Sequence, residues 1–316
     1  MRVGIPRGLL YDRYHPFFIR FFSELGAEPV ISPPTSRAIL DAGVQCCVDE
    51  ACLPVKIFHG HVRYLKDKCD ILFIPRIMQL RKGEYICPKF CGLAEMVTNS
   101  MPDLPWVLSY PIYATSMKNL RRWAQETALP VTGDRKRIFA ALNAAMREQA
   151  RHKTGYDDKG YPIKVALAGH PYNLYDKFIN MNIKEKLNRL GVGVITEEYV
   201  SDEDAAQEVK ALFKKPFWTF ARKTYGSVAA LAARRLVQGV VYISSFACGI
   251  DSVIIELVRD RIGDFPMLVL KIDEHTGEAG VDTRIEAFAD MLERRLGHEG
   301  HRSASGQCVY SCQGPF

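Results

Sequence analysis

Residues 239–250 of the chain read Gly239-Val-Val-Tyr-Ile-Ser-Ser-Phe-Ala-Cys-Gly-Ile250, and this stretch decides the fold. The segment Gly239–Ser244 is apolar at nearly every position, which is typical of a strand buried on both faces of a parallel sheet. The segment Ile250–Arg261 that follows has a helical pattern. Ligands of open parallel sheets bind just beyond the carboxyl ends of the strands, and Cys248 occupies such a position.

The same alternation of strand and helix extends in both directions from this stretch. Ile163–Ala168 and Pro266–Ile272 are strand-like in the second half, as are Val3–Pro6 and Ile71–Pro75 in the first. This order predicts the α/β class, with parallel sheets covered by helices. Residues 153–161 have the composition of a linker. We therefore expect two α/β domains, residues 1–150 and 151–300, followed by a mobile tail over residues 301–316.

The composition excludes several classes of protein. Apolar residues make up 47% and charged residues 25% of the 316 residues, as in ordinary folded proteins. The net charge of +6 is too small and too scattered to indicate a nucleic-acid groove. No apolar run reaches the roughly 18 residues of a membrane span, and the N-terminus lacks the apolar core of a signal peptide. We expect a cytoplasmic protein that binds neither nucleic acid nor a membrane.

Nine cysteines are informative in a compartment that disfavours disulfides. Six of them fall within residues 46–91. Three groups adjoin helix starts: Cys46-Cys47-Val-Asp-Glu-Ala-Cys52, Cys87-Pro-Lys-Phe-Cys91, and Cys248. A helix N-terminus lowers the pKa of a thiol and so favours the thiolate, the form that ligates metals. Clustered cysteines in a reduced chain indicate a metal or redox site.

Iron and zinc compete for this site. Structural zinc commonly uses two close pairs of ligands. Cys87 and Cys91 form one such pair, whereas Cys52 and Cys248 stand alone in different predicted domains. This dispersal favours an iron–sulfur cluster buried in an interdomain cleft over a zinc knuckle. Cys69, which precedes a buried strand, is interpreted as a structural residue.

Several motifs resemble those of a known family. The segment Lys271-Ile-Asp-Glu-His-Thr-Gly-Glu-Ala-Gly-Val-Asp-Thr-Arg-Ile-Glu-Ala-Phe288 resembles the closing motif of 2-hydroxyacyl-CoA dehydratase subunits. Other motifs resemble acyl-CoA dehydratase activase-related proteins of the DUF2229 type: Glu50-Ala-Cys-Leu-Pro-Val-Lys-Ile-Phe-His-Gly-His61, Gly4–Gly8, Cys87-Pro88, Gly169–Tyr172 and Phe246–Gly249. The resemblance implies two flavodoxin- or Rossmann-like domains with an iron–sulfur cluster in the cleft between them.

The resemblance also implies a ligand set and a partner. The implied cluster ligands are Cys52, Cys87 and Cys248, with Cys91 and Cys46 as extra thiols that complete or enlarge the cluster. The cluster is then a cubane [4Fe–4S] or a double-cubane [8Fe–9S] cluster. The implied partner is a dimeric ATP-dependent activase with an actin/Hsp70-like fold and its own [4Fe–4S] cluster, which delivers low-potential electrons.

Three hypotheses for the function follow. The first is a reductase-type enzyme that accepts electrons from the activase and reduces a small substrate in the cleft. The second is a non-catalytic electron-transfer or accessory protein of a larger reductase or dehydratase complex, because no CoA-binding motif is recognisable. The third is a redox or zinc-binding regulatory module, suggested by the cysteine-rich first domain and by Cys308 and Cys312 in the tail. A homodimer is compatible with all three.

Two histidines and a tyrosine are candidates for proton transfer. His170 and Tyr172 follow the first strand of the second predicted domain, at the edge where ligands bind. His61, like His59, lies a few residues beyond Cys52 and is a candidate proton donor near the cluster, with a surface or capping role as the equal alternative.

Two arginine-containing pairs are candidate anion sites. Arg7 and Gly8 end the first strand, and Thr283 and Arg284 are predicted to begin the last helix. Capping of that helix by Asp282 explains the second pair without a ligand.

Overall fold

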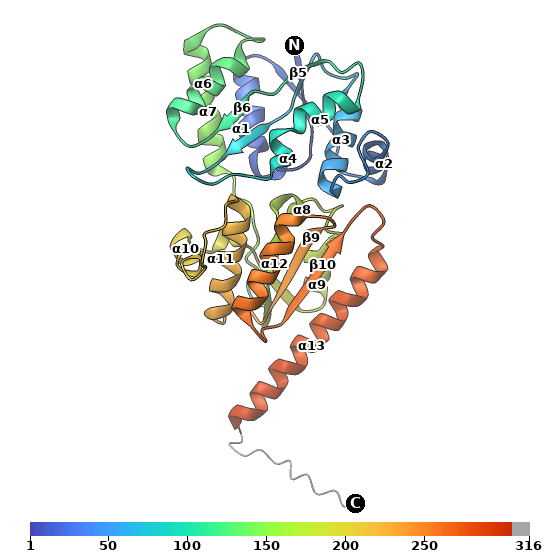
Figure 1. Cartoon of the computed structure of the whole chain (residues 1–316), viewed down its shortest axis with the longest axis vertical. Helices are drawn as coiled ribbons and strands as arrows, with labels where there is room; N and C mark the ends of the chain where they lie inside the picture. Colours follow the sequence, from blue (N-terminus) through green and yellow to red (C-terminus); the bar gives the residue numbers. More distant parts are fainter. Residues whose placement is uncertain (305–316) are drawn as a thin grey trace, which may run out of the picture.

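The computed structural model describes residues 1–304, and it describes the side chains as far as residue 297. Cys308 and Cys312, with most of the predicted tail, lie outside the described residues. Two parallel sheets of four strands each form the framework (Figure 1). None of the helices in the described part of the chain is long and apolar enough to cross a membrane.

The first sheet contains strands from the N-terminal half, in the order β2-β1-β3-β5. Its strands are β1 (Arg2–Ile5), β2 (Glu28–Ile31), β3 (Ile71–Phe73) and β5 (Trp106–Leu108). Two further strands, β4 (Arg76–Gln79) and β6 (Pro111–Tyr113), pair with each other in parallel. The helices of this half are α1 (Tyr11–Glu24), α2 (Arg37–Gln45), α3 (Leu53–Leu65), α4 (Pro88–Cys91), α5 (Leu93–Ser100), α6 (Met117–Ala128) and α7 (Arg135–Arg151).

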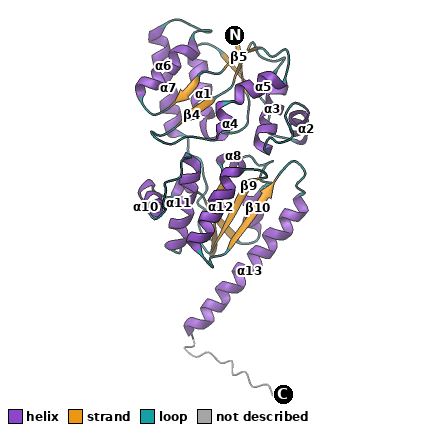
Figure 2. Cartoon of the chain, in the orientation of Figure 1, coloured by secondary structure: helices purple, strands orange, loops and turns teal. Residues whose placement is uncertain are grey.

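The second sheet repeats this arrangement in the C-terminal half, in the order β10-β9-β7-β8. Its strands are β7 (Ile163–Gly169), β8 (Val192–Ile195), β9 (Gly239–Ser245) and β10 (Met267–Ile272). The helices are α8 (Pro171–Tyr175), α9 (Ile183–Arg189), α10 (Asp202–Val209), α11 (Thr219–Ala233), α12 (Gly249–Ile262) and α13 (Glu278–Ala304), with a 3-10 turn, η1 (Glu197–Tyr199). Both orders match doubly wound folds, in which the first strand lies between the second and the third. The predicted α/β class with parallel sheets is therefore confirmed, and it is consistent with a Rossmann- or flavodoxin-like fold (Figure 2).

The central strand β9 shows why the sequence around it is so apolar. All seven of its residues are buried. Val241 and Ile243 pack into the core formed with α9 and α13, whereas Val240 and Tyr242 pack on the opposite face against α11 and α12. Because helices cover both faces of the sheet, neither set of side chains can be polar.

Two helices of the N-terminal half also pack on the C-terminal half. Ile39 and Leu40 of α2 and Leu53 and Ile57 of α3 belong to the same hydrophobic core as strands β7–β10. The buried ammonium of Lys56, on α3, pairs with the carboxylate of Glu274 in the loop after β10. The predicted linker lies between α7 and β7. Figure 1 shows α3 and α4 on the side of the N-terminal half that faces α8.

One glycine of the C-terminal half lies inside a helix. Helix α11 runs through Gly226 without a break. A Cβ at position 226 would overlap the backbone carbonyl of Ala205, on α10. This glycine therefore allows α10 and α11 to approach closely and does not end a helix.

Candidate functional site

Cys248 lies at an unusual turn between β9 and α12. The preceding residue, Ala247, has a φ of +60°, in the left-handed region that residues with a Cβ rarely adopt. This turn makes Cys248 the N-cap residue of α12. Backbone strain of this kind costs about 1–3 kcal/mol and tends to occur at functional sites.

His170 reaches the same place from the neighbouring strand. Gly169 ends β7 with a φ of +141°, and a Cβ there would overlap the carbonyl oxygen of Ile243 on β9. His170 then forms the N-cap of α8, and its side chain is buried. Its Nε2 lies 3.9 Å from Cys248 Sγ and 3.3 Å from Asp251 Oδ1.

Asp251 is a member of this site that sequence reasoning missed. It lies in the first turn of α12 and is 1% exposed. The hydroxyl of Tyr242 donates a 2.8 Å hydrogen bond to its Oδ1, while its Oδ2 is buried without a partner among the described residues. A carboxylate three residues after Cys248, on a helix that opens at the ligand-binding edge, was the signal available in the sequence.

Tyr172 brings the two halves of the site together. Its ring stacks on His170 at a centroid distance of 5.1 Å and lies 6.1 Å from the ring of Phe90, on α4. Burial raises the pKa of Tyr172 well above its ordinary value, and the nearby charges of Cys87 and Cys52 raise it further. The phenol therefore stays protonated in a site to which both halves of the chain contribute thiols.

The pKa values of the thiols reverse one expectation from the sequence. Burial raises the pKa of Cys248 to about 12, with contributions from the charges of Asp251, Cys52 and Cys87. Burial also raises the pKa of Cys87, followed by the charges of Cys52 and Cys91. Desolvation and the nearby negative charges outweigh the effect of the helix N-termini at these two thiols. These interactions show that Cys52, Cys87 and Cys248 lie within electrostatic range of one another.

The remaining cysteines occupy different surroundings. Cys91 is the last residue of α4 and interacts with Cys87. Cys46 is half-buried at the C-cap of α2, and its neighbour Cys47 lies within electrostatic range of Cys52. Cys69 is buried, and its thiol donates a hydrogen bond to the carbonyl of Leu65 at 3.3 Å. All seven cysteines of the described residues are free.

His61 lies in a second polar cluster, away from the thiols. It is nine residues beyond Cys52 on α3, which is roughly 13 Å along a helix axis. Its Nε2 lies 3.1 Å from the hydroxyl of Thr35, which in turn donates a 2.5 Å hydrogen bond to Asp176. Burial, with the nearby charge of Arg7, lowers the pKa of His61 to about 3. The structure thus places His61 as a neutral, buried side chain.

The candidate anion site at the start of the last helix differs from expectation. Helix α13 begins at Glu278, so Thr283 and Arg284 lie in its second turn and the helix N-terminus is elsewhere. The hydroxyl of Thr283 donates to the carbonyl of Ala279, and the guanidinium of Arg284 donates to the carbonyl of Val269. Asp282 does not cap this helix, and it pairs with Lys186. The guanidinium of Arg7 lies 5.5 Å from the ring of Tyr11.

The donor set at Cys248 fits a metal. The ligand atoms of His170, Cys248 and Asp251 all lie within 4.8 Å of one another. Thiolate and imidazole are ligands that zinc and iron use. A bound cation would also satisfy the unpartnered Oδ2 of Asp251 and favour the thiolate forms that burial now disfavours.

One family model matches the chain. It is described as the CoA enzyme activase uncharacterised domain (DUF2229), and it matches residues 2–200. The matched segment contains Cys52, Cys87, His170 and Tyr172, and it ends before β9. No curated protein matches the chain. Because the match spans more than half of the sequence, the chain belongs to the family of the CoA enzyme activase uncharacterised domain, DUF2229.

Proposed function

We propose that the protein binds an iron–sulfur cluster between its two halves and uses it to reduce a small substrate. The observation that carries this proposal is that Cys52 and Cys87, from the N-terminal half, lie within electrostatic range of Cys248, from the C-terminal half, and that all three act on the pKa of Tyr172. Thiolates that approach from separate helix N-caps suit a cluster, which needs several sulfur ligands. In this proposal residues 1–150 and 151–300 are two domains, and the cluster occupies the cleft between them.

The three thiols would hold the cluster, and Cys91 and Cys46 are the further candidate ligands. When bound, an iron–sulfur cluster supplies one-electron chemistry at low potential. Cys47 joins these candidates because it lies within electrostatic range of Cys52. We propose that an ATP-dependent activase with an actin/Hsp70-like fold and its own [4Fe–4S] cluster delivers the electrons, in the cytoplasm.

Two side chains beside the thiols are suited to handling protons. Tyr172 keeps its phenolic proton because burial raises its pKa, so it can donate a hydrogen bond or a proton to a substrate. His170 presents Nε2 between Cys248 and Asp251. The carboxylate of Asp251, fixed by Tyr242, orients the imidazole. A reduction that adds protons with its electrons needs donors of this kind.

A second candidate function rests on the triad of His170, Cys248 and Asp251. Three ligand atoms within 4.8 Å of one another match the protein ligands of a mononuclear zinc site. In this alternative Cys52 and Cys87 are free thiols, and the protein is a zinc-binding or redox-regulated module. The triad uses Cys248 but does not need the N-terminal half.

Metal analysis separates these candidates. Protein expressed and purified without oxygen should be brown and should hold roughly four or eight irons per chain, the sizes of the two clusters considered. One equivalent of zinc with no iron would contradict the cluster and support the triad. Reduction of the cluster by the activase and ATP, without turnover of azide, acetylene, hydrazine or an acyl-CoA, would instead indicate an accessory electron-transfer protein.

A further inference from the structure

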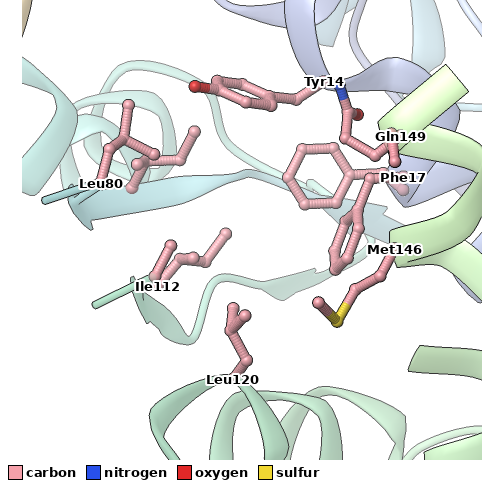
Figure 3. Close-up of a pocket in the computed structure, with 11 residues that line it drawn as sticks. Tyr14, Phe17, Leu80, Ile112, Leu120, Met146 and Gln149 are labelled. Carbon is pink, nitrogen blue, oxygen red and sulfur yellow. The ribbon is translucent and has the colours of Figure 1, made fainter. Parts of the chain in front are cut away.

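An apolar cavity of about 300 Å³ lies in the N-terminal half, away from the cysteine site. Helices α1, α6 and α7 and the paired strands β4 and β6 contribute residues to its lining, several of which Figure 3 shows, and one side is open to solvent. Its walls include Phe17, Ile77, Leu80, Ile112, Leu120 and Met146. Ligand pockets begin at about this volume.

A second cavity, of about 320 Å³, adjoins the first, and Tyr14 and Leu80 line both. The side chain of Tyr14 lies between the apolar cavity and the second cavity, which charged side chains line. Its ring borders the apolar cavity, and Figure 3 shows its hydroxyl directed away from Phe17. The charges that act on this hydroxyl belong to Arg13, Glu197 and Arg81, all of which line the second cavity.

The second cavity is lined by four cationic side chains, Arg13, Arg81, Arg222 and Lys223. Their carboxylate partners are shared. Asp202 pairs with both Arg81 and Lys223, and Glu84 pairs with both Arg222 and Lys215. Glu197 and Glu198 both pair with Arg13. Among the residues that line the cavity, four cations therefore surround one carboxylate, Glu197. Lys215 and the other three carboxylates lie outside the lining.

This cavity also contains the start of α11. Thr219, Phe220 and Arg222 belong to its first turn, Lys223 follows directly, and all four line the cavity. The partial positive charge of a helix N-terminus adds to that of the arginines. The ring of Phe220 stands 6.3 Å from that of His170 and separates this cavity from the cysteine site. The two sites are therefore neighbours with different chemistry.

We propose that the two cavities together bind an amphipathic carboxylate, a medium-chain fatty acid, with its tail in the apolar cavity and its carboxylate among the arginines. The excess of cations selects an anion, and an arginine fork matches the planar carboxylate. The apolar cavity excludes a second charged group, because its only polar lining residues are Tyr14 and Gln149. This ligand site is independent of any cluster at Cys248.

Titration calorimetry of the full chain with sodium decanoate tests this proposal. We expect saturable binding of one decanoate per chain, about fourfold tighter for each methylene added from hexanoate to decanoate. Decyltrimethylammonium, which has the opposite charge, should not bind. Decanol, which lacks the charge, should bind at least tenfold more weakly. Equal binding of decanoate and decanol, or no binding of decanoate at millimolar concentration, would overturn the proposal.

Substitutions in each cavity test where the tail and the carboxylate of decanoate bind. Leu120→Trp fills the apolar cavity and should abolish decanoate binding, and Ala114→Leu fills less of it and serves if the first variant does not fold. Arg81→Gln should weaken decanoate by about tenfold and leave decanol unchanged. Arg122→Gln is the control, because this arginine lies on the exposed face of α6. Unchanged decanoate binding in a folded Leu120→Trp or Ala114→Leu variant would contradict the assignment. A dimer in gel filtration that the Leu120→Trp substitution converts to a monomer would also contradict it, because a second copy of the chain would then fill the cavity.

Discussion

His170 Nε2 lies 3.9 Å from Cys248 Sγ, although 78 positions separate the two residues along the chain. The contact exists because β7 and β9 are hydrogen-bonded neighbours, with Gly169 opposite Ile243. Both strands end at the same edge of the sheet, and each is followed by a helix whose N-cap is one of the two residues. The topology of the sheet therefore builds this site.

Replacing Asp251 should increase the reactivity of Cys248. The carboxylate of Asp251 raises the pKa of this thiol, second only to burial. In metal-free Asp251→Asn protein the pKa should fall, and the rate of alkylation by iodoacetamide at pH 8 should rise on the order of tenfold. Mass spectrometry assigns the rate to each cysteine. Cys69, which bonds to the carbonyl of Leu65, is the internal control. An unchanged rate at Cys248 would show that Asp251 does not act on the thiol.

Tyr172→Phe tests the role of the phenol. The stacking on His170 needs only the ring, so iron content should be unchanged. If the hydroxyl donates a proton in the reduction, turnover of the substrate by protein, activase and ATP should fall by roughly a hundredfold. Tyr199→Phe, at an exposed position, should leave turnover unaffected. Full activity of Tyr172→Phe would remove the hydroxyl from the mechanism.

The buried His61 predicts a loss of stability in mild acid. Its pKa is about 3 in the folded protein, because of burial and the charge of Arg7, and about 6.5 when unfolded. Below pH 6.5 the unfolded chain therefore binds a proton that the folded chain does not. This difference costs about 2 kcal/mol of the free energy of unfolding between pH 6.5 and pH 5.

Urea unfolding of metal-free protein at these two pH values measures the effect. His61→Gln should lose less stability than the wild type over this interval. His275→Gln, at an exposed histidine, should behave as the wild type. Equal losses in the wild type and His61→Gln would contradict the assignment of a neutral His61.

Gly226 tests the contact between α10 and α11. A Cβ at this position would overlap the backbone carbonyl of Ala205, so Gly226→Ala should force the helices apart. Overpacking of this kind costs about 1–3 kcal/mol of the free energy of unfolding. Gly133→Ala is the matched control, since a Cβ there meets nothing within 4 Å. Urea unfolding compares the two variants, and equal stabilities would show that the close approach is not required.

The parallel sheets could be predicted from the sequence because apolar strands and helix starts are local patterns. The structure places Cys248 and His170 at the carboxyl edge of the second sheet. The sequence did not predict the pKa values of the thiols, which depend on burial and on charges from the other half of the chain. The start of α13 was missed for a similar reason. Lys186, on α9, pairs with both Glu278 and Asp282, so a contact distant in sequence holds the first turn of that helix.

The measurement that tests the central claim most directly is iron per chain, with small-angle scattering, for Cys248→Ala and Cys69→Ala proteins prepared without oxygen. If a cluster joins the two halves, Cys248→Ala should lose iron and become less compact, because a thiolate from one wall of the cleft is gone. Cys69→Ala should keep both its iron and its compactness, since Cys69 only bonds to the carbonyl of Leu65. Unchanged iron and compactness in Cys248→Ala, or lost iron in Cys69→Ala, would contradict a cluster held between the halves.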